Sequence, residues 1–233
     1  MKRFIVIFVI SLLTAVGLLA RETIADAVSR NTAGLLLLRG LAGDTASLKR
    51  AGALLRNDSA CSAHWRRGLI AQDRGDTGQR DAEWEAFLRC EPAGAVMVEA
   101  FLPDDLAWAE RAVELAPASG EAWFWLARLL ERADPSDAAE AYARGLERSP
   151  YDAMRWQSYG FVLMRTAGED AALPAFIRSC ELGGNGCRRV GDIMMRRGDI
   201  RTAIQYYRAD PSLMFQRYAD ELEAKLNASV ESH

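Results

Sequence analysis

The chain has 233 residues, of which 50% are hydrophobic and 26% charged, and its formal net charge is -3. This composition is typical of a folded protein body, and the slight negative charge gives no reason to expect nucleic acid as a partner. After roughly the first twenty residues, the length suits one elongated domain.

The N-terminus has the pattern of a membrane segment. Lys2 and Arg3 precede an uncharged run over residues 4–20, which as a helix would span roughly 25 Å of the ~30 Å hydrocarbon core. We predict a transmembrane signal-anchor helix over residues 1–21, with residues 4–20 in the lipid bilayer. A cleaved secretory signal peptide fits the same pattern and stays open as an alternative. In both cases Lys2 and Arg3 stay cytoplasmic and the body is exported.

Residues 22–57 carry helical periodicity that is interrupted at residues 40–44. They have no aromatic residue at the positions that mark the later units. We predict a degenerate first helical hairpin here.

A recurring spacing organises residues 58–211. An interval of 16 positions separates a glycine from an aromatic residue three times: Gly68 and Trp84, Gly160 and Phe176, Gly191 and Tyr207. From Trp156 to Phe176 the residues read W-x2-Y-G-x2-L and then A-x3-F, and Ala127 stands at a corresponding small-residue position. Prolines close the apolar stretches: Pro92, Pro117, Pro150 and Pro211. These patterns together resemble the tetratricopeptide repeat (TPR), a helix–turn–helix unit of about 34 residues.

The resemblance implies an all-α fold, a TPR-type helix–turn–helix solenoid that follows the N-terminal transmembrane helix. Residues 58–211 would form the TPR-like repeats. One unit departs from the pattern, because its first helix over residues 95–101 is short and residues 103–105 begin a new helix. Residues 212–233 would form an amphipathic capping helix and a tail.

The cysteines fall into two pairs. Cys61 opens the first helix of a unit and Cys90 ends its second helix, so an antiparallel hairpin would place them side by side. Cys180 and Cys187 flank a glycine-rich turn. We predict two disulfides and therefore an oxidising compartment; the alternative is four free, buried cysteines. A metal site at Cys61-x2-His64 would lack a fourth ligand, so we expect no metal.

No pattern in the sequence indicates catalysis. His64 is the only histidine away from the C-terminus, and the glycine-rich segment 183–186 joins two helices and lacks the lysine of a phosphate-binding loop. We predict a protein that is not an enzyme, with no catalytic residue and no cofactor.

Two kinds of residue are candidates for binding. The TPR resemblance implies that first helices line an inner groove, and Trp65, Trp125 and Phe161 lie on such helices away from the core spacing, so they are the candidates for protein binding. Arginines are frequent toward the C-terminus, and we predict a basic docking patch of five of them: Arg188, Arg189, Arg196, Arg197 and Arg201. The alternative is that these charges form an ordinary solvated surface.

We therefore predict a membrane-anchored scaffold that binds and stabilises or assembles a membrane or envelope protein complex. It would cross the inner (cytoplasmic) membrane once, with its N-terminus cytoplasmic and its repeat body periplasmic or extracellular. Two alternatives stay open: a cleaved periplasmic module that binds peptides or proteins, and an accessory factor in envelope polysaccharide assembly or export.

Overall fold

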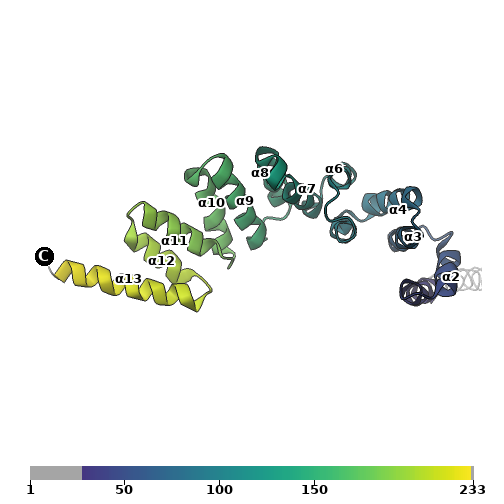
Figure 1. Cartoon of the computed structure of the whole chain (residues 1–233), viewed down its shortest axis with the longest axis horizontal. Coiled ribbons are helices and arrows are strands. Elements are labelled where there is room, and N and C mark those ends of the chain that lie inside the picture. The colour runs from purple at the N-terminus through teal and green to yellow at the C-terminus, as the bar shows by residue number, and fades with distance from the viewer. Residues whose placement is uncertain (1–27, 232–233) are drawn as a thin grey trace, which may run out of the picture. The chain divides into compact units, whose positions relative to one another are not determined.

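The structure, a computed structural model, describes residues 28–231 and the side chains up to residue 228 (Figure 1). The anchor predicted over residues 1–21 lies outside the described residues, as do residues 22–27 of the predicted first hairpin. Within residues 28–231 no helix has both the length and the apolar character needed to cross a membrane. The chain divides into two compact units, Met1–Glu91 and Pro92–His233, so the boundary falls inside the predicted repeat region.

The first unit is built of helices. Residues 28–41 are helical, and three further helices follow: α2 (Thr45–Leu55), α3 (Cys61–Asp73) and α4 (Thr77–Cys90). Aspartates begin two of them, because Asp44 accepts hydrogen bonds from the first-turn amides of α2 and Asp76 accepts one from Gln79 N in α4. α3 and α4 form the antiparallel pair that the spacing of Gly68 and Trp84 predicts.

The second unit is a succession of helix pairs. Its elements are η1 (Pro92–Gly94), α5 (Ala95–Glu99), α6 (Leu106–Leu115), α7 (Gly120–Ala133), α8 (Pro135–Arg148), α9 (Ala153–Thr166), α10 (Glu169–Glu181), α11 (Gly186–Arg196), α12 (Ile200–Ala209) and α13 (Leu213–Glu231). α7 pairs with α8, α9 with α10 and α11 with α12, and each pair packs on the next (Figure 1). This all-helical, TPR-like arrangement confirms the predicted fold class for the body.

The spacing of 16 positions marks where paired helices cross most closely. A Cβ atom on Gly160 would lie 2.6 Å from the ring of Phe176, and one on Gly191 would lie 2.6 Å from the ring of Tyr207. On Gly68 it would lie 2.1 Å from the indole of Trp84. Only glycine lets the first helix approach an aromatic side chain of the second helix this closely.

The pair α7 and α8 reverses this arrangement. Here the glycine is Gly145 on the second helix, and a Cβ atom on it would lie 2.4 Å from the ring of Phe124 on the first. The first helix carries Ala127 at the small-residue position, and this residue is fully buried. In this pair the aromatic residue therefore lies on the first helix and the glycine on the second, the reverse of the other pairs. The presence of Ala127 in the sequence did not indicate this reversal.

Two tryptophans each bond the proline in the loop before their own helix. Trp123 Nε1 donates to the carbonyl of Pro117 at 3.0 Å, and Trp156 Nε1 donates to the carbonyl of Pro150 at 2.8 Å. Trp156 follows Trp123 by 33 positions, and Pro150 follows Pro117 by the same interval, so the bond recurs with the repeat. The proline in the loop before α7, and likewise the one before α9, is thus held by a tryptophan of the helix that follows.

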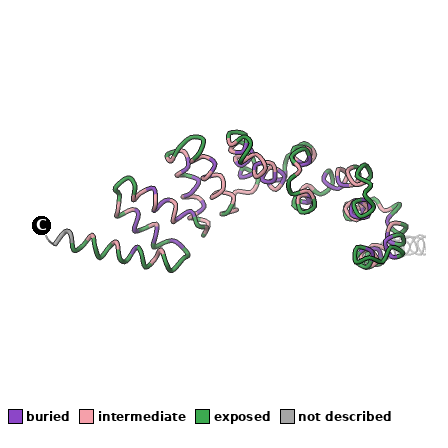
Figure 2. The backbone as a smooth tube through the Cα atoms, in the orientation of Figure 1, coloured by how far each residue is buried: buried purple, intermediate pink, exposed green. Residues whose placement is uncertain are grey.

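The last helix, α13, covers the end of the second unit. Figure 2 shows the buried positions along the facing sides of the paired helices, whereas α13 is mostly exposed. Among its described side chains only Ala219 is buried, and Phe215, Leu222 and Leu226 pack against the core of α12. This is the arrangement expected of a capping helix, which keeps a polar outer face.

Candidate functional site

Of the three aromatic residues predicted to bind a partner, Trp125 is not at the surface. Its side chain is fully buried on α7. The reason is that α7 is flanked by η1, α5 and α6 as well as by α8, so that positions facing away from α8 are also covered. The prediction that Trp125 lines an open groove is therefore wrong.

Phe161 is also engaged within the fold. The residue is half-buried on α9, and its ring meets Phe176 edge to face with centroids 5.3 Å apart. The guanidinium group of Arg189 lies 4.8 Å from the centre of the Phe161 ring. Because Phe176 and Arg189 both lie against its ring, Phe161 is not the free anchor that its position predicted.

The predicted basic patch is largely neutralised by its neighbours. Arg196 donates to Glu169 at 2.8 Å, and Arg197 pairs with Asp170 at 2.5 Å, so α11 is tied to the beginning of α10. Each acid precedes its arginine by 27 positions. A count of charges along one stretch of the sequence therefore does not show that these residues pair.

The other three arginines of the patch differ among themselves. Arg188 lies over the ring of Phe215, at 5.2 Å from its centre, and Arg189 pairs with Asp192 at 3.7 Å. Arg201 is exposed. The five residues therefore do not form one free cationic surface, and most of them stabilise contacts between helices.

Trp65 has a different environment. It is half-buried in the first unit, where its ring stacks on Trp84 with centroids 5.4 Å apart and planes inclined by 21°. It also borders a groove of about 670 Å³ between the helical residues 28–41 and α3. The groove is lined by Asn31, Gly34, Leu35, Leu37, Leu38, Leu41, Trp65, Arg66 and Leu69. We call this feature the leucine groove.

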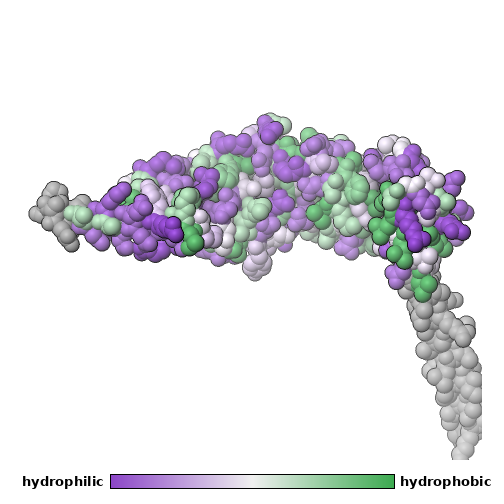
Figure 3. Space-filling view, turned by 60° about the horizontal axis from the view of Figure 1, so that its bottom comes forward, coloured by the Kyte–Doolittle hydropathy of each residue, from purple (hydrophilic) through white to green (hydrophobic). Residues whose placement is uncertain are grey.

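The leucine groove exposes apolar side chains to solvent. Leu35 is 66% exposed, Leu38 67% and Leu41 45%. In Figure 3, hydrophobic surface gathers beside hydrophilic surface on the first unit, at the end that carries α2. Arg66 donates to the carbonyl of Arg30 at 2.5 Å, which holds the helical residues 28–41 against α3. This row of exposed leucines on a fixed scaffold makes the groove a candidate interaction site.

Sequence reasoning did not identify these leucines. They lie in the run Leu35-Leu36-Leu37-Leu38, within a segment that lacks the aromatic markers of the repeats. The signal that could have found them is the run itself, since one face of a helix cannot bury four consecutive leucines.

The cysteines pair as the sequence predicts. The structure joins Cys61 to Cys90, with Cα atoms 5.9 Å apart, and Cys180 to Cys187, with Cα atoms 4.6 Å apart. The first bridge connects the beginning of α3 to the end of α4, and the second joins the end of α10 to the beginning of α11. All four cysteines are thus placed to form bridges that close a helix pair or link two pairs.

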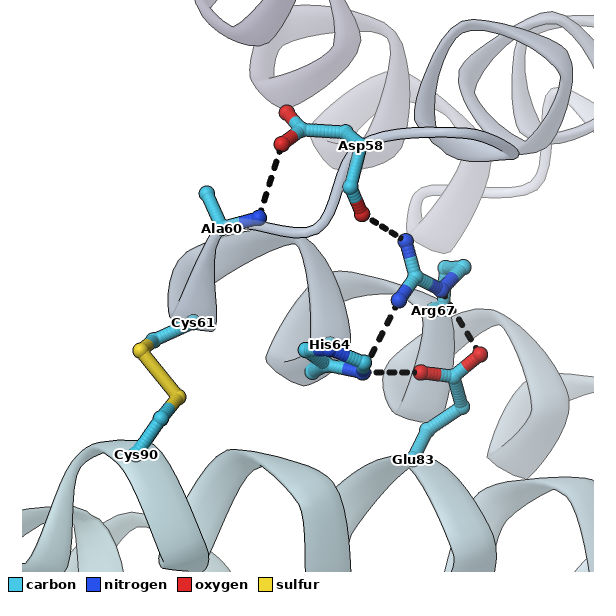
Figure 4. The surroundings of a disulfide bond; sticks show 7 residues. All are labelled: Asp58, Ala60, Cys61, His64, Arg67, Glu83 and Cys90. Atoms are coloured by element: carbon cyan, nitrogen blue, oxygen red, sulfur yellow. Dashed lines mark hydrogen bonds and ion pairs between the residues drawn. A yellow bond between two sulfur atoms is a disulfide. The ribbon is translucent and has the colours of Figure 1, made fainter.

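A cluster of charged side chains lies beside the first bridge (Figure 4). His64 and Arg67 of α3 both point toward Glu83 of α4, with His64 Nδ1 2.7 Å from one carboxylate oxygen and Arg67 Nε 2.6 Å from the other. Arg67 also donates to the carbonyls of Leu55 and Asp58, at 2.7 and 2.6 Å. The cluster therefore ties the end of α2 to the hairpin of α3 and α4.

The electrostatics of this cluster stabilise the charged form of Glu83. Burial alone would raise the pKa of this carboxyl, but hydrogen bonds from Arg67 and His64 outweigh it and hold the pKa below its ordinary value. Both carboxylate oxygens are occupied by these partners, which assigns Glu83 a structural role rather than one in proton transfer. Within the part of the chain that the structure describes, no group of three or more histidine, cysteine, aspartate or glutamate residues could hold a metal ion.

No protein-family model matches the chain. No curated protein matches it.

Among solved structures, a crystal structure of MamA is 18% identical over 69% of this chain and 96% of that chain, with a TM-score of 0.45. A structure of MamA from Desulfovibrio magneticus RS-1 is 19% identical over 67% of this chain and 94% of that chain, with a TM-score of 0.42. YrrB, described as a TPR protein with an unusual peptide-binding site, is 22% identical over 66% of this chain and 84% of that chain, with a TM-score of 0.42. Likeness at these values carries no information about function.

Proposed function

We propose that this protein is a non-enzymatic scaffold that binds a partner protein through the leucine groove of its first unit. The observation that carries the proposal is the row of exposed Leu35, Leu38 and Leu41 beside Trp65, in a groove of about 670 Å³. An aromatic anchor flanked by aliphatic side chains has the composition of an interaction site. In the second unit, the predicted binding residues Trp125 and Phe161 are engaged within the fold.

The occupant that the groove suits best is an amphipathic helix of the partner. Its walls are two helices, and a third helix packs well into the ridges and grooves that helical side chains form. A peptide that binds as an added strand needs a free sheet edge, and residues 28–231 contain no strand. Leu35, Leu38 and Leu41 recur at every third position along one helix, so they form a row against which the apolar face of a second helix can lie.

Membrane anchoring through residues 4–20 belongs to the same proposal. Only residues 21–27 separate that run from the helical residues 28–41, and seven residues reach at most about 25 Å. A groove so near an anchor would favour partners that are themselves in or at the membrane, and the two cysteine pairs agree with export to an oxidising compartment. Intact protein would then retain Met1 and need detergent for extraction; an N-terminus near residue 18 or 21 would instead indicate the cleaved form.

The groove is tested by co-purification of the full chain in mild detergent, followed by mass spectrometry. Leu35→Asp and Leu38→Asp place a charge on the contact surface, whereas Leu54→Asp places the same charge on an exposed leucine of α2 outside the groove. We expect one partner to be lost with the first two variants and kept with Leu54→Asp. With that partner purified, the affinity should fall at least about 30-fold, which corresponds to a loss of about 2 kcal/mol. Equal recovery with all three variants would refute the groove as the binding site.

A further inference from the structure

A second hollow of the first unit has the opposite chemistry to the leucine groove. It measures about 400 Å³ and lies among α2, α3 and α4. Its lining consists of Lys49, Gly52, Ala53, Arg56, Arg67, Ile70, Arg74, Gln79 and Glu83. Four of these side chains are cationic and one is anionic, so the local balance is strongly positive. We call it the basic pocket.

The one acid of the basic pocket is already neutralised. Glu83 pairs with Arg67 at 2.6 Å, and both side chains are largely buried, at 17% and 13% exposure. Arg67 is held further by the carbonyls of Leu55 and Asp58, so it also covers the carbonyl end of α2, which would otherwise repel an anion. This pair forms a fixed and nearly neutral part of the wall.

The remaining cations are available. Lys49, Arg56 and Arg74 are exposed, and in the described part of the chain none of their side chains makes an ion pair or a hydrogen bond. Arginines of the second unit, by contrast, form ion pairs with acids of their own helix: Arg144 pairs with Glu140 and Arg178 with Glu181. Gly52 leaves space beside one of these cations, since even a Cβ atom there would be 3.7 Å from Arg74 Nη2.

We propose that the basic pocket binds a phosphate-bearing ligand through Lys49, Arg56 and Arg74. A phosphomonoester carries close to two negative charges at neutral pH and three acceptor oxygens, so it can satisfy three cations at once, whereas a carboxylate carries only one charge. The planar guanidinium groups of Arg56 and Arg74 can each donate two parallel hydrogen bonds to such oxygens. The volume of the pocket suits a small phosphorylated molecule rather than a long polymer.

Two sources share this chemistry: a soluble phosphate ester and the headgroup of an anionic phospholipid. The full chain is titrated by calorimetry with glycerol 3-phosphate, and in parallel its binding to phosphatidylcholine vesicles is measured with and without phosphatidic acid. Saturable binding of glycerol 3-phosphate supports the proposal with a soluble ligand. Binding that requires phosphatidic acid supports it with a lipid ligand. Absence of both overturns it.

A matched pair of variants separates the pocket from general surface charge. Arg56→Gln combined with Arg74→Gln removes two pocket cations, whereas Arg50→Gln removes one exposed cation of α2 that does not line the pocket. We expect the double variant to bind the phosphate probe at least tenfold more weakly and Arg50→Gln to bind as the unmodified chain does. A proportional loss in both would show attraction to surface charge only and would overturn the site. Neither change touches Arg67 or Glu83, and thermal unfolding of both variants is measured as the control for folding.

The two proposals fail independently. Leu35→Asp and Leu38→Asp alter the leucine groove and leave the lining of the basic pocket unchanged, so they should not affect phosphate binding. Conversely, Arg56→Gln with Arg74→Gln should leave partner binding through the groove intact.

Discussion

The ring of Phe176 occupies the space in which a side chain on Gly160 would lie. A Cβ atom built on Gly160 would be 2.6 Å from that ring, and Phe176 itself is fully buried. The same relation joins Gly191 to Tyr207. The interval of 16 positions in the sequence is therefore a packing rule between two helices.

Gly160→Ala should destabilise the second unit by about 1–3 kcal/mol, because a well-packed core accepts an added methyl group only by moving its neighbours. The measurement is the shift of the urea unfolding curve. Gly78→Ala is the matched control. Gly78 also lies in a helix, but the side-chain atom that a Cβ there would meet, Asp76 Oδ1, is 3.9 Å away, and the better helix propensity of alanine should stabilise the chain slightly. Combining Gly160→Ala with Phe176→Leu should recover part of the loss. If the two alanine variants unfold alike, the close approach is not what glycine provides.

Acid should weaken the first unit through Glu83. Its folded pKa lies below the ordinary value of 4.5 because hydrogen bonds from Arg67 and His64 outweigh the effect of burial. A depressed pKa contributes stability above about pH 4.5, and this contribution is lost as the pH falls through the folded pKa. Glu83→Gln should remove this part of the pH dependence and lower the stability at neutral pH, since Arg67 loses its partner.

The control for the acid prediction is Glu91→Gln, which changes an exposed carboxylate at the end of α4. Unfolding free energies are compared between pH 7 and pH 3. Parallel pH profiles for the unmodified chain and Glu83→Gln would show that this carboxylate is not stabilised in the fold.

Both cysteine pairs should be oxidised in the protein as it is made. Under the chain-entropy model the Cys61–Cys90 bridge, with a sequence separation of 29, should contribute about 3.5 kcal/mol, and the Cys180–Cys187 bridge, with a separation of 7, about 2.5 kcal/mol. Peptide mapping without reduction should recover each pair as one cross-linked fragment. If all four thiols react with an alkylating reagent, the body resides in a reducing compartment and the argument for export fails.

Reversing the charges of Arg196 and Arg197 should affect stability more than binding. The two residues pair with Glu169 and Asp170 across helices, and exposed pairs of this kind are generally worth under about 1 kcal/mol each. Arg196→Glu with Arg197→Glu should therefore lower the unfolding free energy modestly, and exchanging the acids for arginine as well should restore it. Loss of partner binding without a change in stability would reinstate these arginines as a docking patch.

Much of the fold could be predicted from local patterns. Spacing of glycine and aromatic residues located the helix pairs, prolines such as Pro117 and Pro150 located their ends, and position within a hairpin paired the cysteines. Each of these features involves residues of one helix or of two consecutive helices. The geometry of a helical hairpin largely determines the positions of such residues.

The candidate sites depend on longer relations. Trp125 and Phe161 do not occupy the core positions of their own helix pair. Whether such residues reach solvent depends on neighbouring elements. Here α5 and α6 pack against the helix of Trp125, and Arg189 lies over the ring of Phe161. Conversely, Lys49 lies in α2, Arg56 directly follows α2 and Arg74 directly follows α3, and the three meet only when α2 packs on α3. No periodicity within one segment could indicate that meeting.

Site-specific photo-crosslinking in intact cells tests the central claim, that the leucine groove binds a helix of a partner protein, most directly. A photoreactive residue in place of Leu38 should give one discrete adduct with a second protein, and the same residue in place of the exposed Leu54 should give none. Leu35→Asp in the same chain should abolish the Leu38 adduct, whereas Arg56→Gln with Arg74→Gln should leave it unchanged. An adduct confined to the chain itself, identical adducts at Leu38 and Leu54, or none at Leu38 would contradict the claim.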